Sequence, residues 1–406
     1  PKLFADVQAI ISRVQKQGDK ALIAYNKQFD GVTLKQLAVS EAEFTEAEAL
    51  VSDEIKAALK QAKKRIARWH KAGMSKTFTV KTAPGVQCGR IIRPIQRVGL
   101  YIPAGTAPLP STVLMLGIPA QLAECPEVLI CTPPQKNGKV NPVILYAAKL
   151  CGIQKVFKTG GAQAIAAMAV GTETIDPCAK LFGPGNTYVS VAKQLVQSLP
   201  SGPAIDLPAG PSEVLVIADA KSNASCVAAD LLAQAEHGAD SQVVCIATSK
   251  TKLNQIIREV AKQTKTLLRQ EIIQKALAHA RFIYSPTMTE AIAISNQYAP
   301  EHLILSFENA EDVLPQIQAA GSVFMGPWSS ESLGDYCSGT NHTLPTNGYA
   351  RSYSGVSVSS FQLNISTQRI SQKGLQHIGP CAVTLADCEQ LDAHAQSVSI
   401  RLATLS

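Results

Sequence analysis

The chain has 406 residues, of which 46% are hydrophobic and 17% are charged, and its formal net charge at pH 7 is +7. This composition can build a large core and excludes a disordered chain. No apolar run approaches the roughly 18 residues of a membrane-spanning helix and no secretory signal opens the chain, so we expect no membrane partner. At roughly 100 to 200 residues per domain, the length predicts two to four folding units.

The N-terminal part has a helical pattern. Apolar residues recur at helical spacing over residues 3–26, which predicts a helix there. Ser40 and Glu43 have the spacing of a capping box, and we expect them to open a second helical region that runs to about Trp69.

Positive charge is concentrated in the same part of the chain. The excess of Lys and Arg centres on residues 60–71 (KQAKKRIARWHK), which have helical spacing. Such a run can bind nucleic acid or can form the solvated face of a helix. We favour the solvated face, and expect no nucleic-acid partner, because neither an aromatic stacking set nor a nucleic-acid-binding fold signature accompanies the charge.

From residue 88 onward, short β-branched runs alternate with helix-like segments. VGLYIP precedes PSTVLMLGIPAQLAE, and EVLICTP precedes NPVILYAAKLCG. The alternation resumes after AIDLPAGPS with EVLVIADA, NASCVAADLLAQAEHG and SQVVCIATS. This order is typical of β-α-β units around a mainly parallel sheet. We therefore predict an α/β fold with two doubly wound, incomplete Rossmann-like sheets that divide near residues 205–213.

The alternation stops after Met325. The next thirty or so residues are rich in glycine and polar side chains without apolar periodicity, which is typical of a functional loop. The last fifty residues return to a helix-like pattern.

The ten cysteines include no CxxC pair. Cys131 and Cys245 lie inside apolar strand-like runs, where a cysteine usually acts as a small buried hydrophobic residue. We therefore expect free thiols and a reducing, cytoplasmic location.

Three glycine-rich turns follow predicted strands of the first sheet. They begin at Tyr101, Gly160 and Phe182 and contain YIPAGT, GGAQ and FGPGN. Turns of this kind place backbone N–H groups at helix starts, where anionic ligands bind. None is a GxGxxG followed by an acid about 20 residues later, so each turn alone is interpreted as a tight structural connection.

Two pairs of polar residues could carry chemistry. Gln234 and His237 lie three residues apart near the end of a predicted helix, where both could bind a metal, although an exposed pair is the simpler interpretation. Glu301 and His302 precede the apolar run LIL, where they could act as an acid–base pair or merely close the edge of a sheet.

Four further residues complete a possible site. Asp335 and His342 occur in the glycine-rich loop, and Glu389 and His394 lie in the C-terminal segment, five residues apart. If Glu389 and His394 lay on one helix, this separation would point their side chains in different directions. Taken together, the candidates describe a metal site with N and O ligands and open positions, next to an acid–base pair.

Seven motifs extend this interpretation to a family. They are YIPAGTAPLPSTVLM, TGGAQAIAAMAVGTE, FGPGN, DLPAGPSEVLVIADA, LLAQAEHGADSQ, YAPEHLI and GDYCSGTNHTLPT. In these motifs, and over essentially the whole chain, the sequence resembles histidinol dehydrogenase. One departure is Ala104, which stands where the family usually has glycine.

The resemblance implies roles for individual residues. The implied zinc ligands are Gln234, His237, Asp335 and His394, and the implied proton acceptors are Glu301 and His302. The implied substrate contacts are these residues together with Ser212, His342 and Glu389. The implied NAD contacts are Tyr101, Gln163 and Asn186.

The resemblance also implies a reaction and an assembly. The reaction is the zinc-dependent oxidation of L-histidinol via L-histidinal to L-histidine with two NAD, which is the last step of histidine biosynthesis. The assembly is a homodimer with shared active sites. The expected domains are an N-terminal helical segment (1–30), an α/β domain with the metal and catalytic residues (31–100 and 213–350), an α/β domain on the NAD side (101–212), and a C-terminal extension that reaches the partner subunit (351–406).

Two other functions use the same features. A zinc hydrolase could use the metal cluster and Glu301 without a dinucleotide, and a nucleotide-binding module could hold RNA with its basic N-terminal third. Formation of NADH from L-histidinol, or retention of RNA at physiological salt, would separate them.

Overall fold

The structure, a computed structural model, describes residues 2–104, 107–208 and 210–405. Gly105 and Thr106 of the first predicted glycine-rich turn therefore lie outside the described residues. The chain divides into two compact units, of which the first comprises Pro1–Gly73 and Ile95–Phe361 and the second comprises Met74–Pro94 and Gln362–Ser406. Both predicted sheets belong to the first unit.

The predicted N-terminal helix is interrupted once. It forms α1 (Lys2–Gln17) and α2 (Asp19–Tyr25), followed by η1 (Asn26–Asp30). The break falls at Gly18, whose φ of 53° lies in the left-handed region that glycine tolerates.

The predicted capping box is confirmed. The Ser40 side chain accepts a hydrogen bond from the Glu43 backbone N–H at 3.3 Å, and Glu43 Oε2 accepts one from the Ser40 N–H at 2.9 Å. These bonds open α3 (Glu41–Leu50). The helical region predicted to reach Trp69 is two helices, because the Ser52 side chain caps a new helix, α4 (Asp53–Ala72).

The first sheet is parallel and has the strand order β5-β4-β3-β6-β7 among the described residues. Its strands are β3 (Arg97–Tyr101), β4 (Glu127–Thr132), β5 (Lys155–Lys158), β6 (Lys180–Phe182) and β7 (Ala204–Ile205). The connecting helices are α5 (Pro110–Leu122), α6 (Pro142–Leu150), α7 (Gly161–Val170) and α8 (Thr187–Gln197). The three predicted glycine-rich turns follow β3, β5 and β6, at one edge of this sheet.

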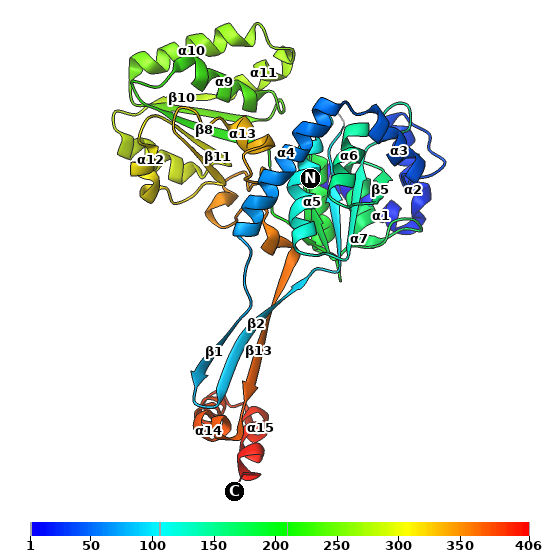
Figure 1. Cartoon of the computed structure of the whole chain (residues 1–406), viewed down its shortest axis with the longest axis vertical. Helices are drawn as coiled ribbons and strands as arrows, with labels where there is room; N and C mark the ends of the chain where they lie inside the picture. Colours follow the sequence, from blue (N-terminus) through cyan, green and yellow to red (C-terminus); the bar gives the residue numbers. More distant parts are fainter. Residues whose placement is uncertain (1, 105–106, 209, 406) are drawn as a thin grey trace. The chain divides into compact units, whose positions relative to one another are not determined.

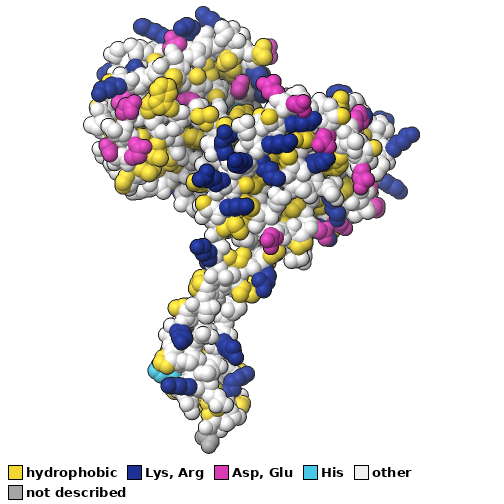
Figure 2. Space-filling view, viewed as in Figure 1, with side chains coloured by type: hydrophobic (Ala, Val, Ile, Leu, Met, Phe, Trp, Pro, Cys, Tyr) yellow, Lys and Arg dark blue, Asp and Glu magenta, His cyan; other side chains and the backbone are white. Residues whose placement is uncertain are grey.

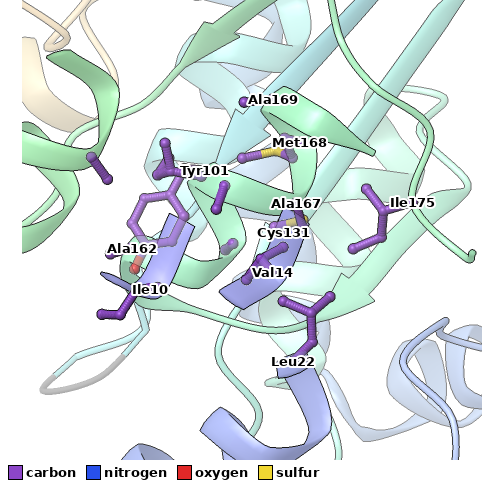
Figure 3. Close-up of a cluster of buried hydrophobic side chains, with 14 of the residues drawn as sticks. Ile10, Val14, Leu22, Tyr101, Cys131, Ala162, Ala167, Met168, Ala169 and Ile175 are labelled. Atoms are coloured by element: carbon purple, nitrogen blue, oxygen red, sulfur yellow. The ribbon is translucent and has the colours of Figure 1, made fainter. Parts of the chain in front are cut away.

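The N-terminal helices complete the core of this sheet. Ile10 and Val14 of α1 pack in one buried cluster with Ala167 and Met168 of α7 and with Cys131 of β4 (Figure 3). The apolar spacing seen in the sequence is therefore the face of α1 that packs against α7 and α8.

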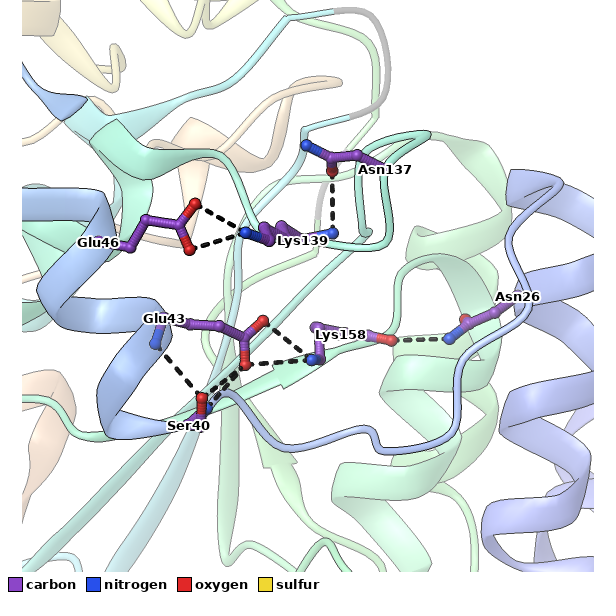
Figure 4. Close-up of polar contacts among 7 residues, drawn as sticks. All are labelled: Asn26, Ser40, Glu43, Glu46, Asn137, Lys139 and Lys158. Carbon is purple, nitrogen blue, oxygen red and sulfur yellow. Dashed lines mark hydrogen bonds and ion pairs between the residues drawn. The ribbon is translucent and has the colours of Figure 1, made fainter.

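Polar contacts join η1 and α3 to the end of β5 (Figure 4). The Lys158 ammonium contacts both carboxylate oxygens of Glu43, at 3.0 and 3.3 Å, and the Lys158 carbonyl accepts a hydrogen bond from the Asn26 amide at 2.7 Å. A second ion pair joins Lys139 to Glu46 at 2.7 Å. Since Lys158 immediately precedes Thr159 and Gly160, these contacts anchor the start of the second predicted glycine-rich turn.

The second sheet repeats the topology of the first, with the order β10-β9-β8-β11-β12 and parallel pairing. Its strands are β8 (Glu213–Ala218), β9 (Gln242–Ala247), β10 (Arg281–Tyr284), β11 (His302–Ser306) and β12 (Ser322–Met325). Its helical elements are α9 (Ala224–Ala235), α10 (Lys250–Thr264), α11 (Gln270–Leu277), α12 (Met288–Tyr298), η2 (Ala310–Gln316) and α13 (Glu331–Tyr336).

Side chains of β8 alternate between two cores. Val214 and Val216 pack toward α9, α10 and α11, whereas Leu215 and Ile217 pack toward α12 (Figure 1). A strand buried on both faces has the continuous apolar sequence seen here. The predicted fold class, with two doubly wound parallel sheets, is thus confirmed.

The second unit contains an antiparallel sheet in the order β1-β2-β13, followed by α14 (Gln372–Cys388) and α15 (Asp392–Ala403). Its strands are β1 (Phe78–Ala83), β2 (Val86–Pro94) and β13 (Gln362–Ile370). The C-terminal segment is helical from α14 onward, as predicted, but the nine-residue β13 was not predicted. Two short helices, η3 (Tyr349–Arg351) and η4 (Val358–Phe361), precede β13 within the first unit.

The basic run lies on α4 and has an amphipathic arrangement. Leu59 and Ile66 are buried, whereas Lys64, Arg65 and Arg68 are exposed. Figure 2 shows Lys and Arg side chains gathered on the part of the first unit where α4 lies. This is the arrangement expected of a solvated helix face.

The structure also bears on the cysteines and on membrane spans. All ten cysteines lie in the described part of the chain and are free, and Cys131 and Cys245 are buried as predicted. Throughout the described ranges, no helix combines the length and the apolar character needed to cross a bilayer.

Candidate active site

Glu301 and His302 lie at the amino end of β11. The helix before them, α12, ends at Ala299, whose φ of 56° turns the chain into the strand. Glu301 Oε2 accepts the backbone N–H of Glu213 at 2.8 Å, and His302 Nδ1 lies 3.0 Å from the Glu213 carbonyl oxygen. Because a carbonyl only accepts, we assign the proton of the neutral ring to Nδ1, which leaves Nε2 as a free base.

Burial controls the protonation of this pair. It lowers the pKa of His302 to about 3, so the imidazole is neutral near pH 7. Burial, together with the nearby charges of Glu213 and Asp335, raises the pKa of Glu301 well above its usual range. The imidazole is therefore neutral with an unprotonated Nε2, and a cation near Glu301 would favour the charged, basic form of that carboxyl group.

Donor atoms for such a cation converge beside His302. One ligand atom each from His237, Glu331 and Asp335 lie within 4.8 Å of one another. His302 Nε2 lies 3.7 Å from Asp335 Oδ1. Burial raises the pKa of Asp335 to about 7 and that of Glu331 well above its usual range. Among the described residues, neither acid forms an ion pair with Lys or Arg, and a cation held between them would supply the counter-charge.

Gln234 gives an independent indication. Its side chain is fully buried near the end of α9, and neither its amide oxygen nor its amide nitrogen has a hydrogen-bond partner among the described residues. Buried polar atoms without a partner are rare, and a bound ion or water is one of the few explanations for them. The alternative of an exposed Gln234–His237 pair therefore fails for Gln234, although His237 is exposed.

Glu331 was not found from the sequence. The residues after Met325 were interpreted as an irregular loop, but residues 331–336 form the helix α13. Its four-residue spacing places Glu331 and Asp335 on one helical face. That spacing in SSESLGDY was the available signal, and it was hidden by the surrounding glycine and serine.

His342 has both ring nitrogens engaged. Nδ1 lies 3.0 Å from the backbone oxygen of Asp335, and Nε2 lies 3.1 Å from the Thr112 hydroxyl. The two contacts assign Nδ1 as the donor and Nε2 as the acceptor. In this arrangement His342 holds the main chain of α13 at Asp335, and a direct substrate contact would require one of the two bonds to break.

The remaining predicted substrate residues are distributed between the units. Ser212 is half-buried and directly precedes β8, next to the residue that contacts Glu301 and His302. Glu389 caps the end of α14 and His394 lies on α15, so the chain reverses between them and they do not share one helix. Both are exposed and belong to the second unit, whereas Gln234, His237 and Asp335 belong to the first.

The predicted NAD residues surround the end of β3. The Tyr101 hydroxyl accepts the backbone N–H of Gly161 at 3.0 Å, and the nearby Gln163 side chain is buried. Asn186 is exposed and caps α8 through Val189 N–H at 3.1 Å. In a doubly wound sheet, ligands bind where the strand order reverses, which here is between β3 and β6.

A buried ion pair supports the turn after β6. Asp206 pairs with Lys193 and accepts the Gly183 N–H at 2.8 Å, while Lys193 donates to the Gly183 carbonyl at 3.0 Å. Gly183 has a φ of 124°, and an added Cβ would lie 2.1 Å from the Tyr101 carbonyl oxygen. Only glycine permits this approach of two turns.

Comparison with known proteins identifies close relatives. The histidinol dehydrogenase family model matches residues 1–402. Histidinol dehydrogenase from Xanthomonas oryzae pv. oryzae is 56% identical over 396 residues, or 98% of this chain and 92% of that protein. The enzyme from Bacteroides thetaiotaomicron is 51% identical over 403 residues, or 99% of this chain and 94% of that protein.

Comparison with solved structures identifies the same family. The crystal structure of histidinol dehydrogenase from Elizabethkingia anophelis is similar with a TM-score of 0.96 and 52% identity, covering 99% of this chain and 92% of that chain. Succinate-semialdehyde dehydrogenase from Burkholderia pseudomallei has a TM-score of 0.52 at 12% identity, a similarity that concerns the fold alone.

Proposed function

Since this chain belongs to the histidinol dehydrogenase family, we propose that it oxidises L-histidinol through L-histidinal to L-histidine, with NAD as oxidant in both steps and one zinc ion per subunit. The observation that carries the proposal is the convergence of N and O donors beside a neutral His302 whose Nε2 is free. Family membership itself makes the chain an oxidoreductase of histidine biosynthesis.

The donor set fits zinc. Gln234, His237 and Asp335 offer two oxygens and one imidazole nitrogen, and the Gln234 amide has no hydrogen-bond partner among the described residues. The nearby Glu331 carboxylate is a further oxygen donor. We propose His394 of the partner subunit as the fourth ligand. When bound, zinc supplies a Lewis-acidic template for the nitrogen atoms of an amino alcohol.

His302 is the proposed base of the first oxidation. Its Nε2 would accept the hydroxyl proton of L-histidinol as the alcohol is oxidised to the aldehyde. The Nδ1–H···O bond to Glu213 fixes the ring for this transfer. NAD, when bound, supplies the hydride acceptor for both oxidations.

Glu301 is the proposed base of the second oxidation. Its carboxylate takes a proton from water as the water adds to the aldehyde, and the resulting hydrate then loses hydride and a proton to give the acid. The Glu213 N–H holds Oε2 in place for this step. A buried base needs such a fixed position, because 1 Å of misplacement can cost about 100-fold in rate.

Tyr101, Gln163 and Asn186 are the proposed cofactor contacts. They lie at the turns that lead into α7 and α8, and the N-terminus of a helix suits the negative charge of a dinucleotide. This placement at the reversal of strand order supports the proposal.

We propose a homodimer in which Glu389 and His394 act in the partner's site. The family resemblance supports this, as does the exposure of both side chains in the second unit. A mixture of His394→Ala and His302→Asn subunits should recover activity after subunit exchange, because one hybrid site has every residue. Lack of recovery in verified heterodimers would contradict the shared site.

The direct test is metal analysis combined with a substrate-dependent absorbance trace. L-Histidinol and NAD should produce NADH, a chelator should abolish the signal, and zinc should restore it. Absence of NADH with zinc present would reject the proposal. Hydrolysis of a small amide or ester without NAD would instead support a zinc hydrolase.

A further inference from the structure

The side chain of Glu213 is a buried carboxyl group that has no role in the reaction described above, where only the main chain of this residue takes part. It opens β8, and only 4% of its surface is exposed. Its Oε1 accepts the backbone N–H of Asn347 at 2.7 Å, and no Lys or Arg in the described part of the chain pairs with it. Because burial of a carboxyl group without an ion pair is costly, the hydrogen bond from the Asn347 N–H is its compensating interaction.

The main chain of Glu213 contacts both catalytic side chains. Its N–H donates to Glu301 Oε2 at 2.8 Å, and its carbonyl oxygen lies 3.0 Å from His302 Nδ1. A single residue thus orients the carboxylate used in one oxidation and the imidazole used in the other.

The loop at residues 346–347 binds the chain at two points, Gly210 and Glu213. The Thr346 hydroxyl accepts the Gly210 N–H at 2.5 Å, and the Asn347 N–H donates to the Glu213 carboxylate. Ser212, a proposed substrate contact, lies between the two anchored residues. The side chain of Glu213 therefore fixes the main-chain groups that hold the catalytic pair.

We propose that Glu213 is a positioning residue for both oxidations, acting through its carboxylate bond to Asn347 N–H and its own main-chain contacts with Glu301 and His302. The inference rests on the proposed function. It predicts that loss of the anchor slows both steps together, because both bases depend on the same peptide groups.

Three substitutions separate anchoring from charge. Glu213→Gln keeps an oxygen that can accept the Asn347 N–H, whereas Glu213→Ala removes it and Glu213→Asp shortens its reach by one methylene. The control is Asp219→Ala, at the opposite end of β8, where Oδ1 accepts the N–H groups of Lys221 and Ser222 at 2.8 Å. Both acids bind backbone N–H groups, but only Glu213 contacts the catalytic residues.

The experiment measures kcat and KM for L-histidinol oxidation and for L-histidinal oxidation in the zinc-loaded enzyme, at a temperature where circular dichroism shows each variant folded. Glu213→Ala should lower kcat about 10- to 100-fold in both reactions, with the KM for NAD and the zinc content unchanged. Glu213→Gln should have a kcat within about threefold of the wild-type value, and Asp219→Ala should have the wild-type kcat.

The outcomes are distinguishable. Wild-type kcat in Glu213→Ala, or equal loss in Glu213→Gln and Glu213→Ala, would overturn the positioning role. If Glu213→Ala does not fold, Glu213→Asp carries the test, since it should also lower kcat in both reactions, and an unchanged kcat would overturn the inference. If the wild-type enzyme itself forms no NADH from L-histidinol, the proposed function has failed instead.

Discussion

The Thr112 hydroxyl lies 3.1 Å from His342 Nε2 and joins the two sheets of the first unit. Thr112 is in the first turn of α5, which follows β3 and its cofactor turn. The other ring nitrogen of His342 contacts the backbone of Asp335. One histidine thus links the proposed cofactor side to the helix that carries a proposed metal ligand.

Loss of this link should reduce stability. In Thr112→Val the side-chain volume is retained, but His342 Nε2 loses its donor, and we expect the free energy of unfolding to fall by about 1–3 kcal/mol. Urea denaturation of the zinc-free protein measures this. Thr112→Ser keeps the hydroxyl and is the control, so equal stability of the two variants would show that the bond contributes nothing.

His302→Asn should remove the base without removing the metal. We expect kcat to fall about 100- to 10,000-fold, because general-base catalysis contributes on that order, while the zinc content stays at one per subunit. Kinetics and metal analysis of the same preparation provide the check. A matching loss of zinc would mean that His302 acts as a ligand.

Glu301→Gln should affect the second oxidation more than the first. The amide cannot accept a proton from water, so L-histidinal oxidation should slow by about 100-fold or more while the first oxidation persists. Trapping the aldehyde with a hydrazine reagent would detect its accumulation. Equal slowing of both reactions would contradict separate roles for the two bases.

Gly183→Ala should disturb the turn between β6 and α8. The new methyl would lie 2.1 Å from the Tyr101 carbonyl oxygen in a backbone region that alanine avoids. We expect a raised KM for NAD and a lower melting temperature. Gly73→Ala is the control, because its methyl would meet nothing closer than 3.9 Å. If both variants had the same KM for NAD and the same melting temperature, the close approach of Gly183 to the Tyr101 carbonyl would be refuted.

His70 should make stability depend on pH. Burial lowers its pKa to about 4 from an ordinary 6.5, so between these values the unfolded chain binds more protons than the folded one. Its contribution is present above pH 6.5 and is lost as pH falls toward 4, by up to about 3 kcal/mol. His70→Gln should flatten this part of the stability curve. The same slope in wild type and variant would contradict the assignment.

Local patterns predicted much of the fold. The alternating apolar runs predicted both sheets because strands buried on two faces require them, and Ser40 with Glu43 predicted a helix start because capping depends only on adjacent backbone groups. The strand β13 was missed because its partner, β2, lies more than 260 residues earlier in the chain. Within β13, only Leu363 and Ile365 alternate with polar residues, and this short alternation is a weak signal for a strand when its partner is not known.

The site was less accessible to sequence reasoning. Gln234 and Glu331 become informative only through burial and convergence, which depend on how α9 and α13 pack beside β11. No local sequence pattern shows that an amide is buried without a partner, or that two acids and a histidine come together. For the same reason, the sequence around Glu213, which lies between Ser212 and the apolar part of a strand, predicted no role for this residue.

The most direct test of the account is the yield of NADH per molecule of L-histidinol in a limiting-substrate reaction with the zinc-loaded enzyme. One centre that contains both His302 and Glu301 should release two NADH and one L-histidine for each L-histidinol, and a chelated sample should release none. A yield of one NADH with aldehyde as the product, or no NADH at all, would contradict it.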